Sequence, residues 1–379
     1  GAGPSFMCSD GVTSMPYEVM GKLELADTTV NFVVCHDLFD TCEATRVLFK
    51  PLVDSHMGCQ VLVFNYASQA GCRFPVPTPE EAKHQDPGAV SLNNEWVAER
   101  LHELLVHVEA TGEMLLSAPF HLVGIGAGSM VAAAFAGRFG ILERYKRSFR
   151  SLVCVNGYTS VDAQLAAIYS SAARVFGSFP ENRPDLPVSY LSKFIFSEEY
   201  MAKVPSNLAL NIYTAVANPL TLEGRIRLCR SALASTPTAP LVGPAQLPVP
   251  LVLVQCTENA LVNGSNVDPW IAGRSAAHLW SHQMRLDERA ASGRGGSLGV
   301  KGREMLLESL GNPAGAFVAW VKAGHEIRQE RKKVMTDLLE LLVTPTPAGE
   351  SGAPLEGAPQ SGHFVPTQDL ITQVYKPNP

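Results

Sequence analysis

The stretch His121–Ser129, HLVGIGAGS, places three glycines between an apolar run and an alanine-rich segment. Phe120–Ile125 is short, continuous and apolar, which is typical of a buried strand, whereas Met130–Phe139 has the pattern of a helix. A strand that turns directly into a helix needs small residues, because the two backbones approach each other closely there. The stretch therefore predicts a tight strand–turn–helix unit.

Other short apolar runs alternate with helical patterns along the chain. The predicted strands are Val30–His36, Gln60–Phe64, Phe120–Ile125, Leu152–Val155, Pro250–Gln255 and Ala316–Val321. The helices predicted between or after these strands are Glu95–Thr111, Met130–Phe139 and Arg328–Val343. Strands that alternate with helices in this way predict an α/β fold, a mostly parallel sheet flanked by helices on both faces.

Residues 159–247 interrupt this alternation with helical segments and no convincing strand. The expected helices are Ala163–Phe176, Tyr190–Lys203, Leu208–Ala217 and Leu222–Ala234. We predict that 159–247 is an inserted helical cap, which divides the core into a first part, 1–158, and a second part, 248–343. Residues 288–303 are rich in glycine and serine and predict a surface loop.

Residues 344–379 form a tail rich in proline and glycine, whose composition cannot bury a core. Its end, residues 363–375, is more apolar and is expected to dock on a partner or on the body of the protein. A disordered tail is the alternative. The candidate partner-binding residues are Phe364, Leu370, Ile371, Val374 and Tyr375.

Composition excludes several classes of protein. The chain has 379 residues and a net charge of −6, and no basic face dominates, so nucleic acid is not expected as the main partner. Charged residues make up only 17%, against about 25% in typical domains. A surface so poor in charge is expected to be covered in part by other proteins. No apolar run reaches the roughly 20 residues of a transmembrane helix.

Eight cysteines without a CxxC pair argue against a zinc site and favour buried thiols in a reducing cytoplasm. The chain begins at Gly1, so import into an organelle stays an open alternative. His278 and His282 lie at i, i+4 spacing, and we expect them on a helix surface, because no third metal ligand is evident. No metal and no cofactor are expected.

The segment Gly124-Ile125-Gly126-Ala127-Gly128 resembles the nucleophile elbow of the α/β-hydrolases, a strained turn of the form G-x-S-x-G. The flanking glycines are present, but the position of the nucleophile is Gly126, which has no side chain. A dinucleotide-binding loop is the alternative, but the G-x-G-x-x-G pattern is incomplete here.

Three further landmarks of that family follow in the expected order. His36-Asp37 ends an early strand and resembles the oxyanion turn, in which Leu38 and Phe39 would offer backbone N–H groups. Ala127, next to the elbow glycine, is assigned to the same oxyanion-like turn. The resemblance assigns the catalytic acid to Asn259 and the catalytic histidine to His325. The triad positions therefore contain Gly126, Asn259 and His325, so only the histidine is retained.

The resemblance thus implies a hydrolase fold without hydrolase chemistry. Each triad member contributes several orders of magnitude to the rate, and the oxyanion hole alone retains only about 10³-fold over water. Ser129 and Asp162 are the candidate relocated groups. Ser129 lies in the first helical turn, where a serine usually hydrogen-bonds local backbone.

The glycine-only elbow is similar to that of the non-catalytic branch typified by the N-myc downstream-regulated proteins. The cap segments Leu186–Tyr200 and Asn211–Cys229 faintly resemble hydrolase-like proteins of cilia and flagella. We therefore predict a structural or interaction module that binds protein partners in an assembly. Two alternatives remain: a protein that binds a small apolar ligand, and a weak esterase with His325 as general base.

Overall fold

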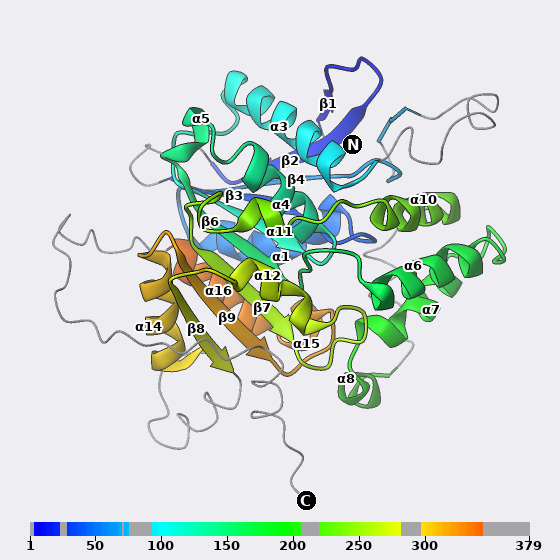
Figure 1. The fold of residues 1–379 in the computed structure, drawn as a ribbon. Helices are drawn as coiled ribbons and strands as arrows, with labels where there is room; N and C mark the ends of the chain where they lie inside the picture. Colours follow the sequence, from blue (N-terminus) through cyan, green and yellow to red (C-terminus); the bar gives the residue numbers. More distant parts are fainter. Residues whose placement is uncertain are drawn as a thin grey trace, which may run out of the picture.

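The computed structural model describes residues 4–22, 29–69, 72–75, 92–205, 220–281 and 297–343. Within them the chain forms a nine-stranded sheet in the order β1-β2-β4-β3-β5-β6-β7-β9-β8 (Figure 1). The pairs β1–β2 and β2–β4 are antiparallel and all the others are parallel, so the predicted mostly parallel sheet is confirmed. The strands are β1 Ser5–Met7, β2 Ser14–Met20, β3 Val30–Cys35, β4 Cys59–Phe64, β5 Phe120–Ile125, β6 Phe149–Val155, β7 Leu251–Cys256, β8 Ala276–Ser281 and β9 Gly315–Val321.

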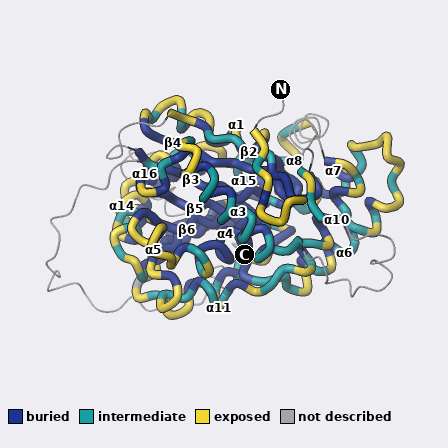
Figure 2. The backbone as a smooth tube through the Cα atoms, turned by 90° about the horizontal axis from the view of Figure 1, so that it is seen from above, coloured by how far each residue is buried: buried dark blue, intermediate teal, exposed yellow. Residues whose placement is uncertain are grey.

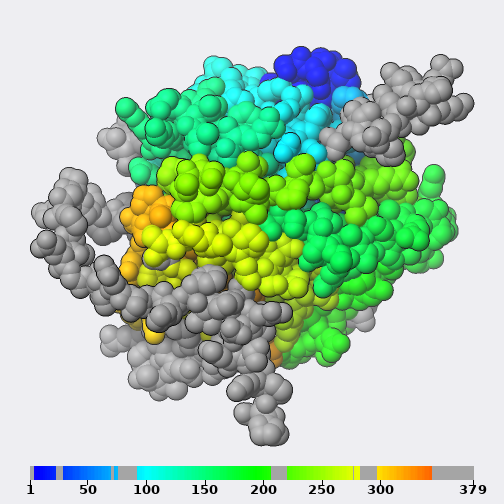
Figure 3. Space-filling model, in the orientation of Figure 1, coloured from blue at the N-terminus to red at the C-terminus, as the bar shows by residue number. Residues whose placement is uncertain are grey.

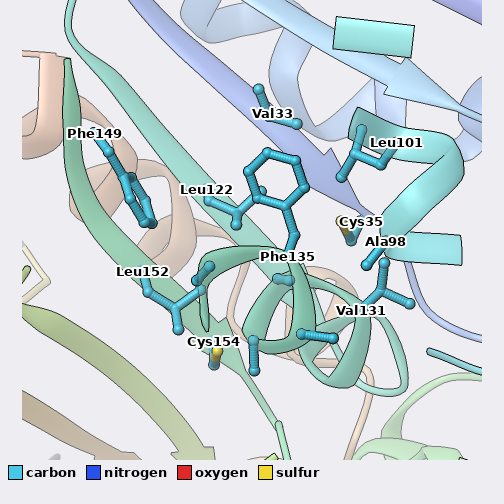
Figure 4. Close-up of a cluster of buried hydrophobic side chains, with 14 of the residues drawn as sticks. Val33, Cys35, Ala98, Leu101, Leu122, Val131, Phe135, Phe149, Leu152 and Cys154 are labelled. Atoms are coloured by element: carbon cyan, nitrogen blue, oxygen red, sulfur yellow. The ribbon is translucent and has the colours of Figure 1, made fainter. Parts of the chain in front are cut away.

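Helices cover both faces of the sheet. One face packs against α3 (Asn94–Ala110), α4 (Gly128–Arg138), α11 (Ala239–Val242) and α12 (Asp268–Ile271). Leu101 of α3 and Phe135 of α4 meet the strand residues Val33 and Leu122 in this layer (Figure 4). The other face packs against α1 (Cys42–Ser55), α14 (Gly299–Leu310), α15 (Ile327–Glu330) and α16 (Lys332–Val343). The central strands are therefore buried on both sides, as Figure 2 shows in dark blue, which explains their continuous apolar runs.

Among the described residues, four further helices lie between β6 and β7 before α11 and form a body at one side of the sheet (Figure 1). They are α6 Ala163–Phe176, α7 Asp185–Ile195, α8 Glu198–Lys203 and α10 Leu222–Leu233. Their apolar faces make a third buried cluster, which also takes in Leu38, Phe39 and Leu261 from the core. The predicted segment Tyr190–Lys203 is divided between α7 and α8, and Leu208–Ala217 lies outside the described residues.

The structure corrects three expectations. His278 lies on β8, at the edge of the sheet, and not on a helix; its Nε2 is 3.5 Å from Glu308 Oε1. Residues 299–303, predicted as loop, begin α14. The antiparallel strands β1 and β2, and the parallel edge strand β8, were not predicted, because their sequences lack the continuous apolar run of the other strands. The tail from residue 344 and His282 lie outside the described residues.

The cysteines are free thiols, and seven of the eight are buried. Cys35, Cys154 and Cys256 lie inside strands, at most 3% exposed, as small apolar residues of the core. Within the described part of the chain, no helix is both long and apolar enough to cross a bilayer.

His121 is a buried histidine on β5 that joins two layers of the fold. Its Nδ1 lies 2.8 Å from Ser151 Oγ, and its Nε2 lies 3.2 Å from the carbonyl oxygen of Leu342 in α16. Burial lowers the pKa of His121 from 6.5 to about 4, because the charged ring would be desolvated.

We predict a loss of stability in mild acid that depends on His121. The folded pKa lies below the unfolded one, so the unfolded state binds more protons between pH 6.5 and 4, and folding weakens as the pH falls through this window. Between pH 7 and pH 4, His121 is expected to lower the free energy of unfolding by about 3 kcal/mol. Urea unfolding at pH 7 and pH 4 measures it. His121→Gln is expected to be less stable at pH 7 but to lose less on acidification; an unchanged loss would contradict the assignment.

Candidate functional site

The elbow between β5 and α4 has the predicted geometry. Gly126 adopts φ +52°, the left-handed region that favours glycine, and its N–H donates to the carbonyl oxygen of Val155 at 2.8 Å. A Cβ built on Gly126 would overlap the carboxylate of Asp37. The space that a side chain at the elbow would enter is therefore filled by a carboxylate from the turn after β3.

Three donors hold the carboxylate of Asp37. Its Oδ1 accepts hydrogen bonds from the backbone N–H groups of Leu38 at 2.7 Å and Ala127 at 2.9 Å. Leu38 and Ala127 were both assigned to the oxyanion-like turn, and their N–H groups point at the same atom. Phe39, which was expected to offer the second N–H group, is not one of these donors. Its Oδ2 lies 2.6 Å from Nε2 of His325. The side chain of Asp37 thus connects the oxyanion turn to the histidine.

Asp37 is held in its ionised form. Burial by itself would raise the pKa of this carboxyl group, but the hydrogen bonds from His325, Ala127 and Leu38 outweigh it and hold the pKa below its usual value. A carboxylate that accepts several hydrogen bonds is stabilised in its charged form. At neutral pH the oxyanion-type donors therefore face a full negative charge that belongs to the protein itself.

Asn259 lies on the other side of the His325 ring. Its Oδ1 accepts hydrogen bonds from the backbone N–H groups of Leu261 and Val262, both at 3.0 Å, which fixes the orientation of the amide. Its Nδ2 therefore points at Nδ1 of His325, at 3.1 Å. An amide NH₂ group can only donate, so Nδ1 is an acceptor and carries no proton.

This arrangement sets the tautomer of His325. With Nδ1 accepting from Asn259, the ring proton is on Nε2 and is donated to Asp37. In a serine–histidine–acid triad the ring is used the other way round: Nδ1–H donates to the acid and Nε2 accepts the proton of the nucleophile. Both ring nitrogens of His325 are thus engaged, in the tautomer opposite to the one that a triad requires.

The candidate relocated groups serve the fold in other ways. Ser129 is fully buried; its Oγ donates to the carbonyl oxygen of Gly126 at 2.6 Å and accepts from the N–H of Tyr158 at 3.2 Å. Asp162 caps α6 by accepting from the N–H of Leu165 at 2.9 Å, and its other oxygen accepts from Asn266 at 3.1 Å. Neither side chain hydrogen-bonds His325 in the structure.

His36 is a buried turn residue. Its Nδ1 lies 2.8 Å from the carbonyl oxygen of Asp37, and its own carbonyl oxygen accepts from the hydroxyl group of Tyr66 at 2.7 Å. Burial lowers its pKa, so the ring is kept neutral. His36 shapes the turn that presents Asp37 and Leu38.

A buried ion cluster beside the site was not predicted. The guanidinium group of Arg328 binds both oxygens of Glu326, with Nε 2.6 Å from Oε1, and also binds Asp40. Burial opposes the charge of Arg328, but Asp40 and Glu326 outweigh it and raise its pKa well above the usual value. The cluster connects the turn after β3 to the turn that carries His325.

Hydrogen bonds join the cap to the turn that carries His325. Glu330 accepts from the N–H of Ser197 at 2.8 Å, from the Oγ of Ser197 at 2.6 Å and from the N–H of Gly324 at 3.1 Å. The N–H of Glu326 donates to the carbonyl oxygen of Ile195 at 2.9 Å. These contacts join α7 and α8 to the residues on both sides of His325.

The space that remains between the cap and the site is small. The cavity is about 30 Å³ and is lined by Asp37, Leu38 and His325 from the core and by Tyr169, Leu191 and Phe194 from the cap. This is room for about one water molecule, whereas pockets for drug-sized ligands are typically about 300–1,000 Å³. Among the described residues no three histidine, cysteine or carboxylate side chains are grouped to hold a metal ion.

The comparisons with known proteins place the chain by its structure alone. No family model and no curated protein matches the sequence. The structure is similar to MGS-M2, an α/β-hydrolase enzyme from a Medee basin deep-sea metagenome library (TM-score 0.58, 16% identity), over 89% of this chain and 96% of that one. The chain has the α/β-hydrolase fold.

Two further α/β-hydrolases show the same degree of similarity. An enol-lactonase from Burkholderia xenovorans is 14% identical over 89% of this chain and 99% of that one, with a TM-score of 0.55. An esterase from Exiguobacterium antarcticum is 11% identical over 90% of this chain and 99% of that one, with a TM-score of 0.58. At this identity the likeness supports the fold, and the chemistry has to be argued from the site.

We predict that Gly126 and Asp37 are energetically coupled. Gly126→Ala is expected to cost about 1–2 kcal/mol for its left-handed backbone and roughly 1–3 kcal/mol more for the overlap with Asp37. In an Asp37→Gly background the second cost should disappear, which gives a coupling of at least about 1 kcal/mol in a double-mutant cycle. Urea unfolding of the four proteins measures it.

The matched control for this cycle is Gly112→Ala. Gly112 has φ +74°, and an added Cβ there would meet no atom within 4 Å, so this substitution isolates the backbone cost. Its cost should be the same with and without Asp37. Equal costs for Gly126→Ala in the two backgrounds would show that the carboxylate does not fill the elbow.

We also predict the tautomer of His325. Long-range ¹H–¹⁵N NMR at pH 7 should show a protonated Nε2 and an unprotonated Nδ1, because Asn259 Nδ2 is the donor to Nδ1. Asn259→Asp replaces this donor by an acceptor and should place a proton on Nδ1. A protonated Nδ1 in the unaltered protein would contradict the assigned network.

Proposed function

We propose that this α/β-hydrolase-fold protein is catalytically inactive and acts as a structural or interaction module in a larger assembly. The observation that carries the proposal is the carboxylate of Asp37, which fills the space beside Gly126 and accepts from both oxyanion-type donors. A substrate carbonyl group would need those same two donors. The site is thus occupied by the chain at the point where a substrate would react.

The oxyanion-type donors give a second argument for inactivity, in addition to the missing nucleophile. An open oxyanion hole would retain about 10³-fold catalysis over water even without a triad. Here the donors face the ionised Asp37, which repels any developing oxyanion. A substrate would have to displace a carboxylate held by three hydrogen bonds, so even this residual contribution is expected to be lost.

The same network counts against a weak esterase that uses His325. A general base needs a free lone pair within reach of water. The lone pair on Nδ1 accepts from Asn259, and Nε2 carries the proton that is donated to Asp37. The small-molecule alternative is also disfavoured, because a cavity of about 30 Å³ is too small to enclose an apolar ligand.

A role in binding proteins is supported by the rigidity of the cap and by the sequence. The contacts of Glu330 hold the cap against the core and leave little freedom for a lid that admits substrates. The glycine elbow favours the non-catalytic branch typified by the N-myc downstream-regulated proteins. A ciliary or flagellar setting rests on the sequence of the cap alone, and the proposed partner segment, residues 363–375, lies outside the described residues.

The proposal is tested by serine-directed phosphonate labelling and by hydrolysis of activated esters. We expect no labelling and no turnover by the unaltered protein. The triple variant Asp37→Gly, Gly126→Ser, Asn259→Asp restores a nucleophile, an open oxyanion hole and an acid, and is expected to be labelled at residue 126. Adding His325→Ala to the triple variant should abolish the labelling.

The opposite outcome is equally well defined. Stoichiometric labelling of the unaltered protein that is lost in Ser129→Ala would overturn the proposal. Ester turnover that is lost in His325→Ala would overturn it in favour of the weak esterase. If the triple variant folds and stays unlabelled, then the filled oxyanion site is not what prevents catalysis.

A further inference from the structure

Residues 138–150, RFGILERYKRSFR, concentrate positive charge in an acidic chain. They contain five of the 30 lysine and arginine residues but only one of the 36 acidic residues. The segment runs from the end of α4 through α5 (Glu143–Lys146) into the start of β6. The five basic side chains are all exposed: Arg138, Arg144, Lys146, Arg147 and Arg150.

Two large aliphatic side chains lie among these charges. Ile141 is 48% exposed and Leu142 is 40% exposed. They precede α5 directly, in a turn that is held from within by the fully buried ring of Tyr145 and by the buried Phe149. The hydroxyl group of Tyr145 lies 3.0 Å from Nδ1 of His102 on α3. The apolar pair is therefore held outward by a rigid support.

The charges are only partly neutralised. Arg138 pairs with Glu99 at 2.9 Å, Arg144 pairs with Glu109 at 2.6 Å, and Lys146 pairs with Glu143 at 3.2 Å. The two arginine pairs are 35–38% exposed and the lysine pair is more exposed, and ion pairs that water reaches contribute little. Within the described residues, Arg147 and Arg150 form no ion pair. The patch thus keeps an excess of positive charge around an aliphatic tip.

Residues 138–150, the basic patch, lie far from the candidate site around Asp37 and His325. The carbonyl oxygen of Ser148 accepts from the N–H of Phe120, the first residue of β5, so the segment lies at the amino ends of the parallel strands. Asp37 and His325 follow β3 and β9 and lie at the carboxyl ends. Figure 1 shows α5 at the periphery and the cap helices on the opposite side of the molecule. In Figure 3 the same region, in green-teal, forms part of the outer contour.

We propose that residues 138–150 bind the surface of a membrane that contains anionic lipids. Clusters of four to eight basic residues gain roughly 1 kcal/mol each near such a surface, and exposed aliphatic side chains gain further by entering the interface. Nucleic acid would form ion pairs with the arginines but would not bury the aliphatic pair. An anionic lipid surface attracts the basic side chains and also buries the aliphatic ones.

Co-sedimentation with vesicles tests the proposal. The protein should bind vesicles of phosphatidylcholine with 30% phosphatidylserine, bind pure phosphatidylcholine vesicles much more weakly, and lose binding as salt is raised to about 0.5 M, where exposed charges are screened. Arg147→Gln with Arg150→Gln should weaken binding about 25-fold, or about fivefold for each charge. Ile141→Ser with Leu142→Ser should weaken it roughly tenfold or more.

The matched control is Arg174→Gln with Arg230→Gln. These two exposed arginines lie on α6 and α10 of the cap, without an ion-pair partner among the described residues, so the control removes the same charge from the far side of the molecule. It should leave binding unchanged. Equal loss in the two double variants, equal binding to both kinds of vesicle, or binding to poly(U) RNA in place of vesicles would overturn the proposal. None of these results depends on whether the protein is an enzyme.

Discussion

The contact between the carboxylate of Asp37 and its three donors governs the whole carboxyl edge of the sheet. One side chain accepts from Leu38 in the turn after β3, from Ala127 in the elbow and from the ring of His325. Because an ionised carboxylate lies there, the ring must present a proton on Nε2, and Asn259 can satisfy Nδ1 only as a donor. Three loops at this edge of the sheet are thus joined by a single internal charge.

Charged side chains beside the site also join the cap to the core. Arg328 connects Asp40 to Glu326, and Glu330 connects Ser197 to Gly324, so both sides of the His325 turn are held by charge-assisted hydrogen bonds. Buried charges of this kind are costly unless every member is paired. Their close pairing favours one fixed position of the cap over the open and closed positions that a lid would need.

The sequence was sufficient for the sheet and for the elbow, because both depend on local pattern. Six continuous apolar runs predicted six parallel strands, and α6 was predicted with its observed bounds. The edge strands β1 and β8, and β2 beside β1, escaped prediction, because their sequences lack the continuous apolar run that marks the other strands. The role of the Asp37 side chain was also missed, although Asp37 was named as part of the turn. That role depends on the space left by Gly126, far along the chain, which no local pattern records.

The glycine at the elbow has a consequence for how this chain can change by mutation. A serine introduced at position 126 would meet the carboxylate of Asp37, so the nucleophile cannot return as a first step. Removing Asp37 first would leave two backbone N–H groups and a histidine without their partner, which costs stability. Each substitution on its own is therefore expected to destabilise the fold. Residues 37 and 126 are thus linked by the space they share, so a change at either position depends on which residue occupies the other.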